Sequence, residues 1–239
     1  MIKEALQYIM SMGTARIEEV NGQQFSTQPL HLVSEPRVNA LKLNSLSGIV
    51  DYLKSNFDSD DDVRLIHIVS PTEVVVVTRV NHDMERNVFI KTQALIPQFH
   101  FDKFFDAEEF NIALQSRFVE TADRGHILKI VGNIRDENVT TFGDDGVSQQ
   151  VTAKVGIATV DKVKVPNPVN LKPYRTFVEV EQPESAFVFR MRSGQTAPVC
   201  ALFEADGGAW KNEAMANVLE YLNQELAELI ESKQIVIIA

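Results

Sequence analysis

Apolar residues recur at helical spacing near both ends of the chain. Residues 2–10 place them at positions 2, 5, 6, 9 and 10, on one side of a helix rather than in the alternation of a strand. Residues 212–232 repeat them in steps of four, with glutamates on the opposite side. The pattern therefore predicts a short helix at the start and a longer amphipathic helix near the end. The apolar stripe of the longer helix is formed by Val218, Leu222, Leu226 and Ile230.

A hairpin and a capped helix are predicted after the first helix. Two strand-like segments, 15–20 and 23–27, flank Asn21-Gly22, a pair that tolerates positive φ at both central positions of a type I′ turn. Ser45 precedes a stretch with apolar residues at helical spacing, so its hydroxyl can cap a helix there. The apolar stripe of that helix is predicted to contain Leu46, Ile49, Val50, Leu53 and Phe57.

The central part of the chain shows strand patterns followed by a helix signal. Runs rich in β-branched residues at 63–69, 73–80 and 86–92 predict an antiparallel meander. Asp106 stands three residues before Glu109, which is the spacing of a capping box. We therefore predict a helix that begins directly after Asp106.

A second helix and a β-rich stretch follow. Thr121 is a candidate cap for a helix whose apolar positions are Ile127, Ile130 and Val131. From residue 138 to about residue 203, short alternating runs separated by prolines predict strands.

Taken together, these patterns predict an α+β fold. We expect antiparallel sheets with packed helices, a β-rich second half and a C-terminal amphipathic helix. The expected division is a helix-and-meander region at 1–136 and a β-rich region with the closing helix at 137–239. The two regions can also form one continuous domain.

Composition and charge narrow the class of protein. The 239 residues are 44% hydrophobic and 23% charged, which suits a folded globular chain. Lys+Arg 23 against Asp+Glu 33 gives a net charge of −10, which repels a phosphate backbone and disfavours nucleic-acid binding. The single cysteine, Cys200, rules out an intramolecular disulfide and favours a reducing compartment. Because no apolar run reaches the roughly 18 residues of a membrane span, we expect a cytoplasmic protein that does not enter a membrane.

One glycine-rich turn is a candidate functional site. Residues 141–149 combine two glycines with Asp144, Asp145 and Ser148. Loops often carry functional sites, so these three residues form a candidate functional turn, and the alternative is an ordinary β-turn. Adjacent carboxylates face opposite ways on a strand, so a two-carboxylate metal site would need the turn to redirect them. The sequence indicates no catalytic, cofactor-binding or metal-ligating residue beyond this turn, and no cofactor is expected.

The end of the chain offers a candidate interface. Trp210, the single tryptophan, directly precedes the last helix and suits either a packed anchor or a subunit interface. We group it with the stripe of Val218, Leu222, Leu226 and Ile230 as a candidate interface of a homo-oligomer. Residues 234–238 are rich in β-branched side chains and need a strand partner, in the same chain or in another subunit.

The order of several segments carries a family resemblance. A helix at 43–56 and strands at 63–80 are followed by the sequence FDKFFDAEEFNIALQS at 101–116, by residues 143–149 and by residues 174–177. In this order they resemble the YfdQ-like family of phage and prophage proteins. The resemblance implies a protein of temperate phages with an unassigned biochemical activity, and it supplies no catalytic or binding residues.

We therefore expect a phage-encoded, non-enzymatic protein of the host cytoplasm that acts by self-assembly or by binding a host or phage protein. The sequence does not decide whether the chain is an enzyme. Two alternatives stay open. One is an accessory factor in phage DNA replication or recombination. The other is a small metal-assisted hydrolase that uses the Asp144/Asp145 turn.

Overall fold

The computed structural model divides the chain into two compact units, Met1–Arg37 and Val38–Ala239. The residues that it describes are 2–13, 15–20, 23–26, 37–58, 62–81, 84–133, 143–144, 149–155, 159–165, 167–192, 194 and 198–239.

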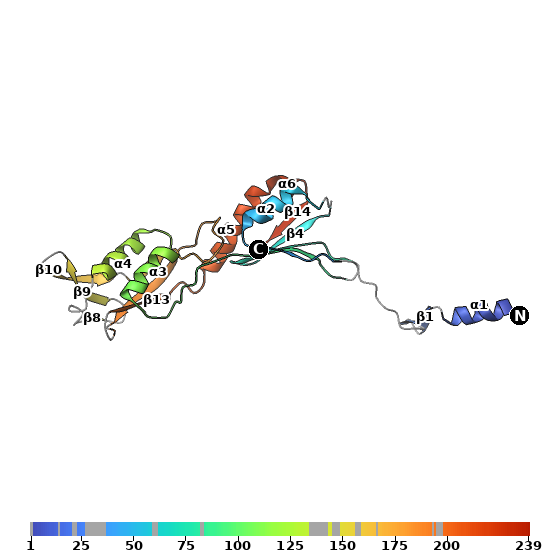
Figure 1. Cartoon of the computed structure of the whole chain (residues 1–239), viewed down its shortest axis with the longest axis horizontal. Helices are drawn as coiled ribbons and strands as arrows, with labels where there is room; N and C mark the ends of the chain where they lie inside the picture. Colours follow the sequence, from blue (N-terminus) through green and yellow to red (C-terminus); the bar gives the residue numbers. More distant parts are fainter. Residues whose placement is uncertain are drawn as a thin grey trace. The chain divides into compact units, whose positions relative to one another are not determined.

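The described part of the first unit comprises a helix and a hairpin (Figure 1). Helix α1 (Ile2–Met12) is followed by β1 (Ile17–Val20), which pairs antiparallel with β2 (Gln23–Ser26). The last residue of β1 lies opposite the first residue of β2, so the predicted hairpin is confirmed. Its two turn residues lie outside the described residues.

The larger sheet of the second unit has the strand order β14-β4-β5-β6-β3. Its centre is the predicted meander, because β4 (Arg64–Ser70), β5 (Glu73–Val77) and β6 (Val88–Gln93) pair antiparallel. The outer strands run parallel to their neighbours: β14 (Ile235–Ile238) pairs with β4, and β3 (Leu41–Leu43) pairs with β6. The sheet therefore has an antiparallel centre, as predicted, and parallel edges that the local pattern did not indicate.

Helix α2 (Leu46–Ser55) begins at the predicted cap. The Ser45 Oγ accepts a hydrogen bond from the Gly48 N–H at 3.2 Å. The helix ends at Asn56, whose φ of 44° lies in the left-handed region. Phe57 follows this end and is 81% exposed, so it does not extend the apolar stripe as we predicted. The buried residues of the helix are Leu46, Ile49 and Val50.

The predicted C-terminal amphipathic helix is present as α5 (Trp210–Glu225) and the short α6 (Ala227–Glu231), which meet at Leu226. Val218, Leu222 and Leu226 are at most 1% exposed, and they share a core with α2 and with the apolar residues of the larger sheet. Figure 1 shows α2, α5 and α6 grouped on one side of this sheet.

The smaller sheet of the second unit has the order β11-β12-β13-β7 and is antiparallel throughout. Its strands are β11 (Val169–Leu171), β12 (Ser185–Arg192), β13 (Val199–Glu204) and β7 (Phe105–Asp106). A separate sheet, β10-β9-β8, contains β8 (Gly143–Asp144), β9 (Gln149–Val155) and β10 (Thr159–Val165).

Two capped helices, α3 (Ala107–Arg117) and α4 (Ala122–Asn133), bury apolar residues against the smaller sheet. The Asp106 Oδ1 accepts a hydrogen bond from the Glu109 N–H at 2.7 Å, which confirms that predicted cap. The Thr121 Oγ1 accepts one from the Arg124 N–H at 3.1 Å. The helix residues buried in this core include Phe110, Leu114, Ile127, Ile130 and Val131, and Phe118, directly after α3, is buried with them.

The observed fold is α+β, with a strand-rich second half and a C-terminal amphipathic helix, as predicted. The boundary that we expected between residues 136 and 137 lies outside the described residues. Helices α3 and α4, which precede it, share one core with β11, β12 and β13, which follow it.

The packing of α5 leads to a stability prediction. Leu222→Ala removes a fully buried side chain and should lower the free energy of unfolding by about 3 kcal/mol. Leu95→Ala is the matched control, because Leu95 is 72% exposed and its loss should cost less than about 0.5 kcal/mol. Urea denaturation measures both values. Equal losses in the two variants would show that α5 does not contribute to the core in this way.

Candidate functional site

A buried arginine gathers polar side chains between the two cores of the second unit. Arg175 lies in the segment that joins β11 to β12 and is 5% exposed. Its Nη1 donates a hydrogen bond to the Glu204 Oε1 at 2.7 Å, and its Nη2 donates to the Ser185 Oγ. The same Nη2 lies 4.0 Å from the Asp206 Oδ2. We call Arg175, Ser185, Glu204, Asp206 and Trp210 the Arg175 cluster.

Trp210 belongs to this cluster through its ring. The Arg175 guanidinium carbon lies 4.0 Å from the ring centroid, which is the geometry of a cation–π contact. Trp210 is the first residue of α5, and the turn before it contains Gly207 and Gly208, with φ of 64° and 83°. The Asp206 Oδ1 accepts a hydrogen bond from the Gly208 N–H at 3.0 Å. The cluster therefore holds the start of α5 against the smaller sheet.

The cluster sets one buried cation against two carboxylates. Burial lowers the pKa of Arg175 to about 10, although Glu204 and Asp206 act in the opposite direction. The guanidinium therefore remains protonated at neutral pH. Burial also opposes the charge of Asp206, but hydrogen bonds from Ser185 and the Gly208 N–H outweigh it and lower the pKa of that carboxyl. The cluster is thus a set of paired charges suited to holding structure.

A glutamine fixes the segment that carries the arginine. The Gln182 Oε1 accepts hydrogen bonds from the Arg175 N–H at 3.0 Å and the Thr176 N–H at 3.2 Å. The Thr176 hydroxyl donates to the Pro71 carbonyl, between β4 and β5, at 2.5 Å. This segment therefore connects the cluster to the larger sheet.

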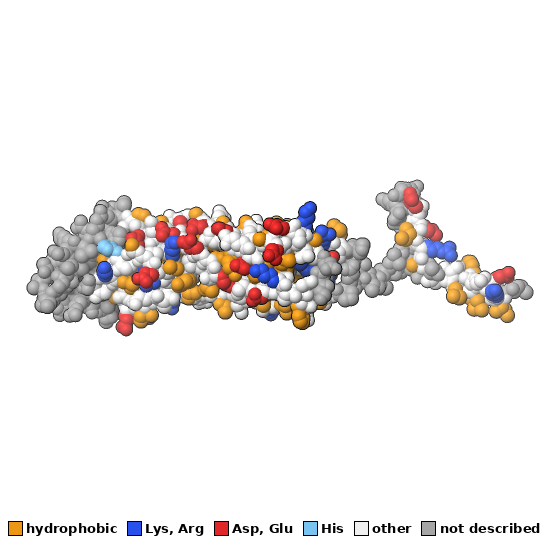
Figure 2. Space-filling model, turned by 90° about the horizontal axis from the view of Figure 1, so that it is seen from above, with side chains coloured by type: hydrophobic (Ala, Val, Ile, Leu, Met, Phe, Trp, Pro, Cys, Tyr) orange, Lys and Arg blue, Asp and Glu red, His pale blue; other side chains and the backbone are white. Residues whose placement is uncertain are grey.

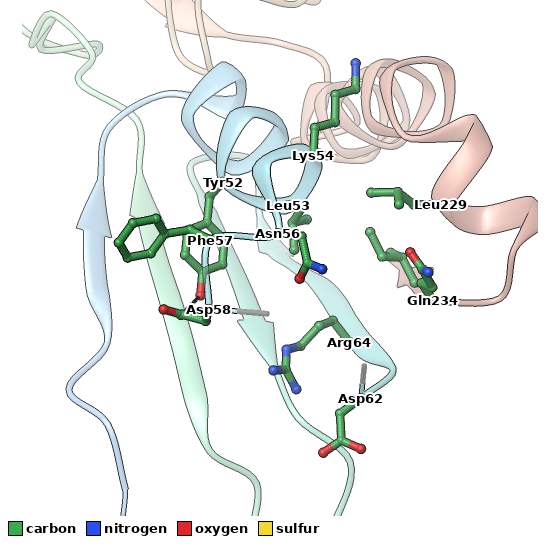
Figure 3. Close-up of a pocket in the computed structure, with 11 residues that line it drawn as sticks. Tyr52, Leu53, Lys54, Asn56, Phe57, Asp58, Asp62, Arg64, Leu229 and Gln234 are labelled. Atoms are coloured by element: carbon green, nitrogen blue, oxygen red, sulfur yellow. Dashed lines mark hydrogen bonds between the residues drawn. The ribbon is translucent and has the colours of Figure 1, made fainter. Parts of the chain in front are cut away.

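A small cavity lies at the end of α2, beside β4 and β14 (Figure 3). Its volume of about 110 Å³ corresponds to a few water molecules, whereas pockets for drug-sized ligands measure roughly 300–1,000 Å³. Lys54 and Arg64 bring positive charge to its lining, and Asp58 and Asp62 bring negative charge. The Tyr52 hydroxyl donates to Asp58, and the Arg64 guanidinium carbon lies 4.1 Å from the centroid of the Phe89 ring. The size and mixed charge give this cavity no clear preference for a ligand.

The described histidines and the cysteine do not form a catalytic arrangement. His100 and Asp102 are both exposed and lie outside the strands. Cys200 is fully buried in the smaller sheet, and burial raises the pKa of its thiol to about 12. A buried thiol of this kind is protonated and a poor nucleophile at neutral pH. Within the described residues, His, Cys, Asp and Glu side chains form no group able to hold a metal ion.

The predicted candidate turn is only partly described. Asp144 lies in β8 and pairs with Gln149 of β9. Asp145 and Ser148 lie outside the described residues, so the functional turn stays a prediction.

The predicted interface stripe packs inside the protomer. Val218, Leu222 and Leu226 are buried in the chain's own core, and Ile230 packs at its margin. Trp210 contacts Arg175. Periodicity showed which side of the helix is apolar but not that a sheet of the same chain covers it. Whether these residues also take part in assembly stays a prediction. The strand partner that residues 234–238 require is β4 of the same chain.

Helix α1 carries several exposed apolar side chains. None of the residues Ile2–Met12 is buried, although apolar residues line one side of this helix. We call these residues the α1 stripe: Ile2, Ala5, Leu6, Ile9 and Met10. Three of them are 80%, 55% and 60% exposed, namely Ile2, Leu6 and Ile9. Figure 2 shows hydrophobic side chains gathered along this helix.

Comparisons with family models, curated proteins and solved structures found no match for this chain. The resemblance to the YfdQ-like family therefore stays a prediction. None of the described helices is both long enough and apolar enough to span a membrane.

The Arg175 cluster supports a prediction about stability. Arg175→Leu leaves Glu204 and Asp206 without their cation and should lower the free energy of unfolding by about 3 kcal/mol. It should also change the emission of Trp210, the single tryptophan, because the guanidinium no longer covers its ring. Arg192→Leu is the control, since Arg192 is an exposed cation that also lies over an aromatic ring. If both variants lost the same stability, the cluster would not be the support of α5 described above.

Cys200 supports a prediction about pH. The folded state holds the thiol protonated up to a pH of about 12, whereas the unfolded thiol ionises near its ordinary pKa of about 9. The unfolded state therefore releases a proton first, and stability should fall by about 1.4 kcal/mol per pH unit above pH 9. Cys200→Ala should lack this part of the decline. Denaturant titrations of both proteins between pH 8 and pH 11 measure the difference, and parallel curves would contradict it.

Proposed function

We propose that this chain is a non-enzymatic, phage-encoded protein that acts in the host cytoplasm by binding another protein molecule through α1. The observation that carries the proposal is the exposure of the whole α1 stripe. A free helix of 11 residues is marginally stable in water, so a helix of this length gains most from a partner that covers its apolar side.

The spacing of the stripe suits one mode of recognition. Ile2, Leu6 and Ile9 stand at i, i+4 and i+7, which are the positions that anchor a helix in a groove of a partner protein. Burying each of these side chains contributes roughly 1.5–3 kcal/mol before the costs of association. The stripe is therefore large enough to support specific binding.

The polar side of α1 supports a protein partner rather than a lipid surface. Helices that lie on membranes carry several lysines or arginines on their polar side. Between Ile2 and Met12 the charged residues are Lys3 and Glu4, which cancel. The net charge of −10 likewise supports a protein partner over DNA.

The phage context rests on the resemblance to the YfdQ-like family, and the cytoplasmic location rests on the lone cysteine. The partner is a host protein, a phage protein or a second copy of the chain.

Photo-crosslinking tests this proposal. A photoreactive amino acid placed at Ala5, within the α1 stripe, should give one defined adduct in cells that express the full chain. The same amino acid at Gln7, on the opposite side of α1, is the control and should give little adduct. Leu6→Glu combined with Ile9→Glu should abolish the Ala5 adduct, because both charges disrupt an apolar contact. Equal labelling from Ala5 and Gln7, or an adduct that survives the double substitution, would overturn the proposal.

A further inference from the structure

The second unit contains two separate cores. One lies between the smaller sheet, α3 and α4, and the other lies between the larger sheet, α2 and α5. We call them the smaller-sheet core and the larger-sheet core. Among the described residues, no buried side chain belongs to both, and the helices and strands of one core make few contacts with those of the other. Loops therefore determine how the two cores are held together.

The loop between β11 and β12 contacts both cores. We call residues 174–182 of this loop the strap. The strap begins at the smaller-sheet core, where the Tyr174 N–H donates a hydrogen bond to the Arg117 carbonyl at the end of α3 at 2.9 Å. The next residue, Arg175, binds Glu204 of β13. The first two residues of the strap are therefore attached to the smaller-sheet core.

The following residues of the strap are attached to the larger-sheet core. Phe177 and Val180 are buried in that core. The Thr176 hydroxyl donates to the Pro71 carbonyl, in the turn between β4 and β5. The strap therefore joins the two cores within a few residues.

A carboxylate of the strap also binds the start of α2. The Glu179 Oε1 accepts hydrogen bonds from the Leu46 N–H at 2.7 Å and from the Ser47 N–H at 3.3 Å. The first N–H groups of a helix have no partner within the helix, and the helix dipole favours a negative charge beside them. Glu179 thus supplies a partner from a segment about 130 residues away.

Gln182 fixes the shape of the strap. Its side chain is buried, and its Oε1 accepts from the N–H groups of Arg175 and Thr176. Its Nε2 donates to the carbonyls of Phe177 at 2.9 Å and Val180 at 3.3 Å. One buried side chain therefore connects the part of the strap on the smaller-sheet core to the part on the larger-sheet core.

The other two connections between the cores are loops of a kind that can bend. Ala94 is buried in the larger-sheet core and Phe99 packs against the smaller-sheet core, whereas residues 95–98 between them are all exposed. The second connection, residues 205–209, contains Gly207 and Gly208, both with positive φ. Short loops that absorb changes in backbone angles are typical hinges between rigid bodies.

We infer that the strap holds the two cores in one orientation, and that releasing Thr176 and Glu179 lets the cores move as two bodies about residues 95–98 and 205–209. The contact between Arg175 and Trp210 lies at the end of the second hinge, so it stays in place as a pivot. This inference is independent of the proposed function, because no residue of α1 takes part in it.

Pulsed dipolar spectroscopy of the full chain tests the strap. Spin labels at Ile112→Cys on α3 and Phe57→Cys after α2 report on different cores; both positions are exposed, and the buried Cys200 stays unlabelled. Unlabelled chain is added in excess so that only distances within one molecule are recorded. The unchanged strap should give one narrow distance distribution. Thr176→Val combined with Glu179→Leu should broaden it about twofold, because two attachments to the larger-sheet core are lost.

Two further variants control this experiment. Val178→Ala is the matched control, because Val178 lies in the strap and is 71% exposed, and it should leave the distribution unchanged. Gln182→Leu should broaden the distribution, because it removes the hydrogen bonds within the strap. An unchanged distribution in the Thr176/Glu179 variant, or equal broadening by Val178→Ala, would overturn the inference.

Hydrogen exchange separates a change of orientation from unfolding. In the Thr176/Glu179 variant, exchange should become faster in peptides that contain the strap and the start of α2. It should stay at the wild-type rate in β5 and β12, which lie inside the two sheets. Faster exchange in both of these strands would show that the strap is needed for the folding of the cores and would contradict movement of two intact bodies.

Discussion

The burial of one side of α5 against the larger sheet is the contact on which the second unit depends. Strands β4, β5 and β6 come from residues 64–93, whereas α5 begins at residue 210. One face of the sheet is therefore fully buried only when this C-terminal helix packs against it. Strand β14 then follows α6 and pairs with β4. The Arg175 cluster contacts Trp210, the first residue of α5, and so positions the start of this helix. Sheet, helix and edge strand are therefore stabilised together.

This arrangement determines which apolar surface remains exposed. The helices α2 and α5 cover one face of the larger sheet, and α3 and α4 use their buried residues on the smaller sheet. The α1 stripe lies outside both cores. Exposed apolar surface that is grouped on one element, as opposed to scattered, is typical of sites that bind other proteins.

Local features of the sequence predicted much of the fold. Ser45 and Asp106 were identified as caps because each forms its hydrogen bond to a residue only three positions away. The meander and the hairpin were predictable for the same reason, since their strands are neighbours along the chain. Phe57 continues the apolar spacing, but the helix ends before it, and periodicity alone does not reveal that end.

Features that depend on distant residues were not predictable in this way. Arg175 has no local signal, because its partners Ser185, Glu204 and Asp206 become neighbours only when the strands pair. The parallel pairing of β14 with β4 likewise joins residues about 170 positions apart. The stripe on α5 was identified correctly as apolar, yet the sequence left open whether the same chain or a second copy covers it.

Hydrogen exchange followed by mass spectrometry tests most directly the claim that the α1 stripe binds another protein molecule. The full chain is compared alone and in the adduct that forms through the photoreactive amino acid at Ala5. The account predicts slower exchange in the adduct for peptides that contain α1, with unchanged exchange in α3 and α4. Identical exchange in α1 in both samples would contradict it.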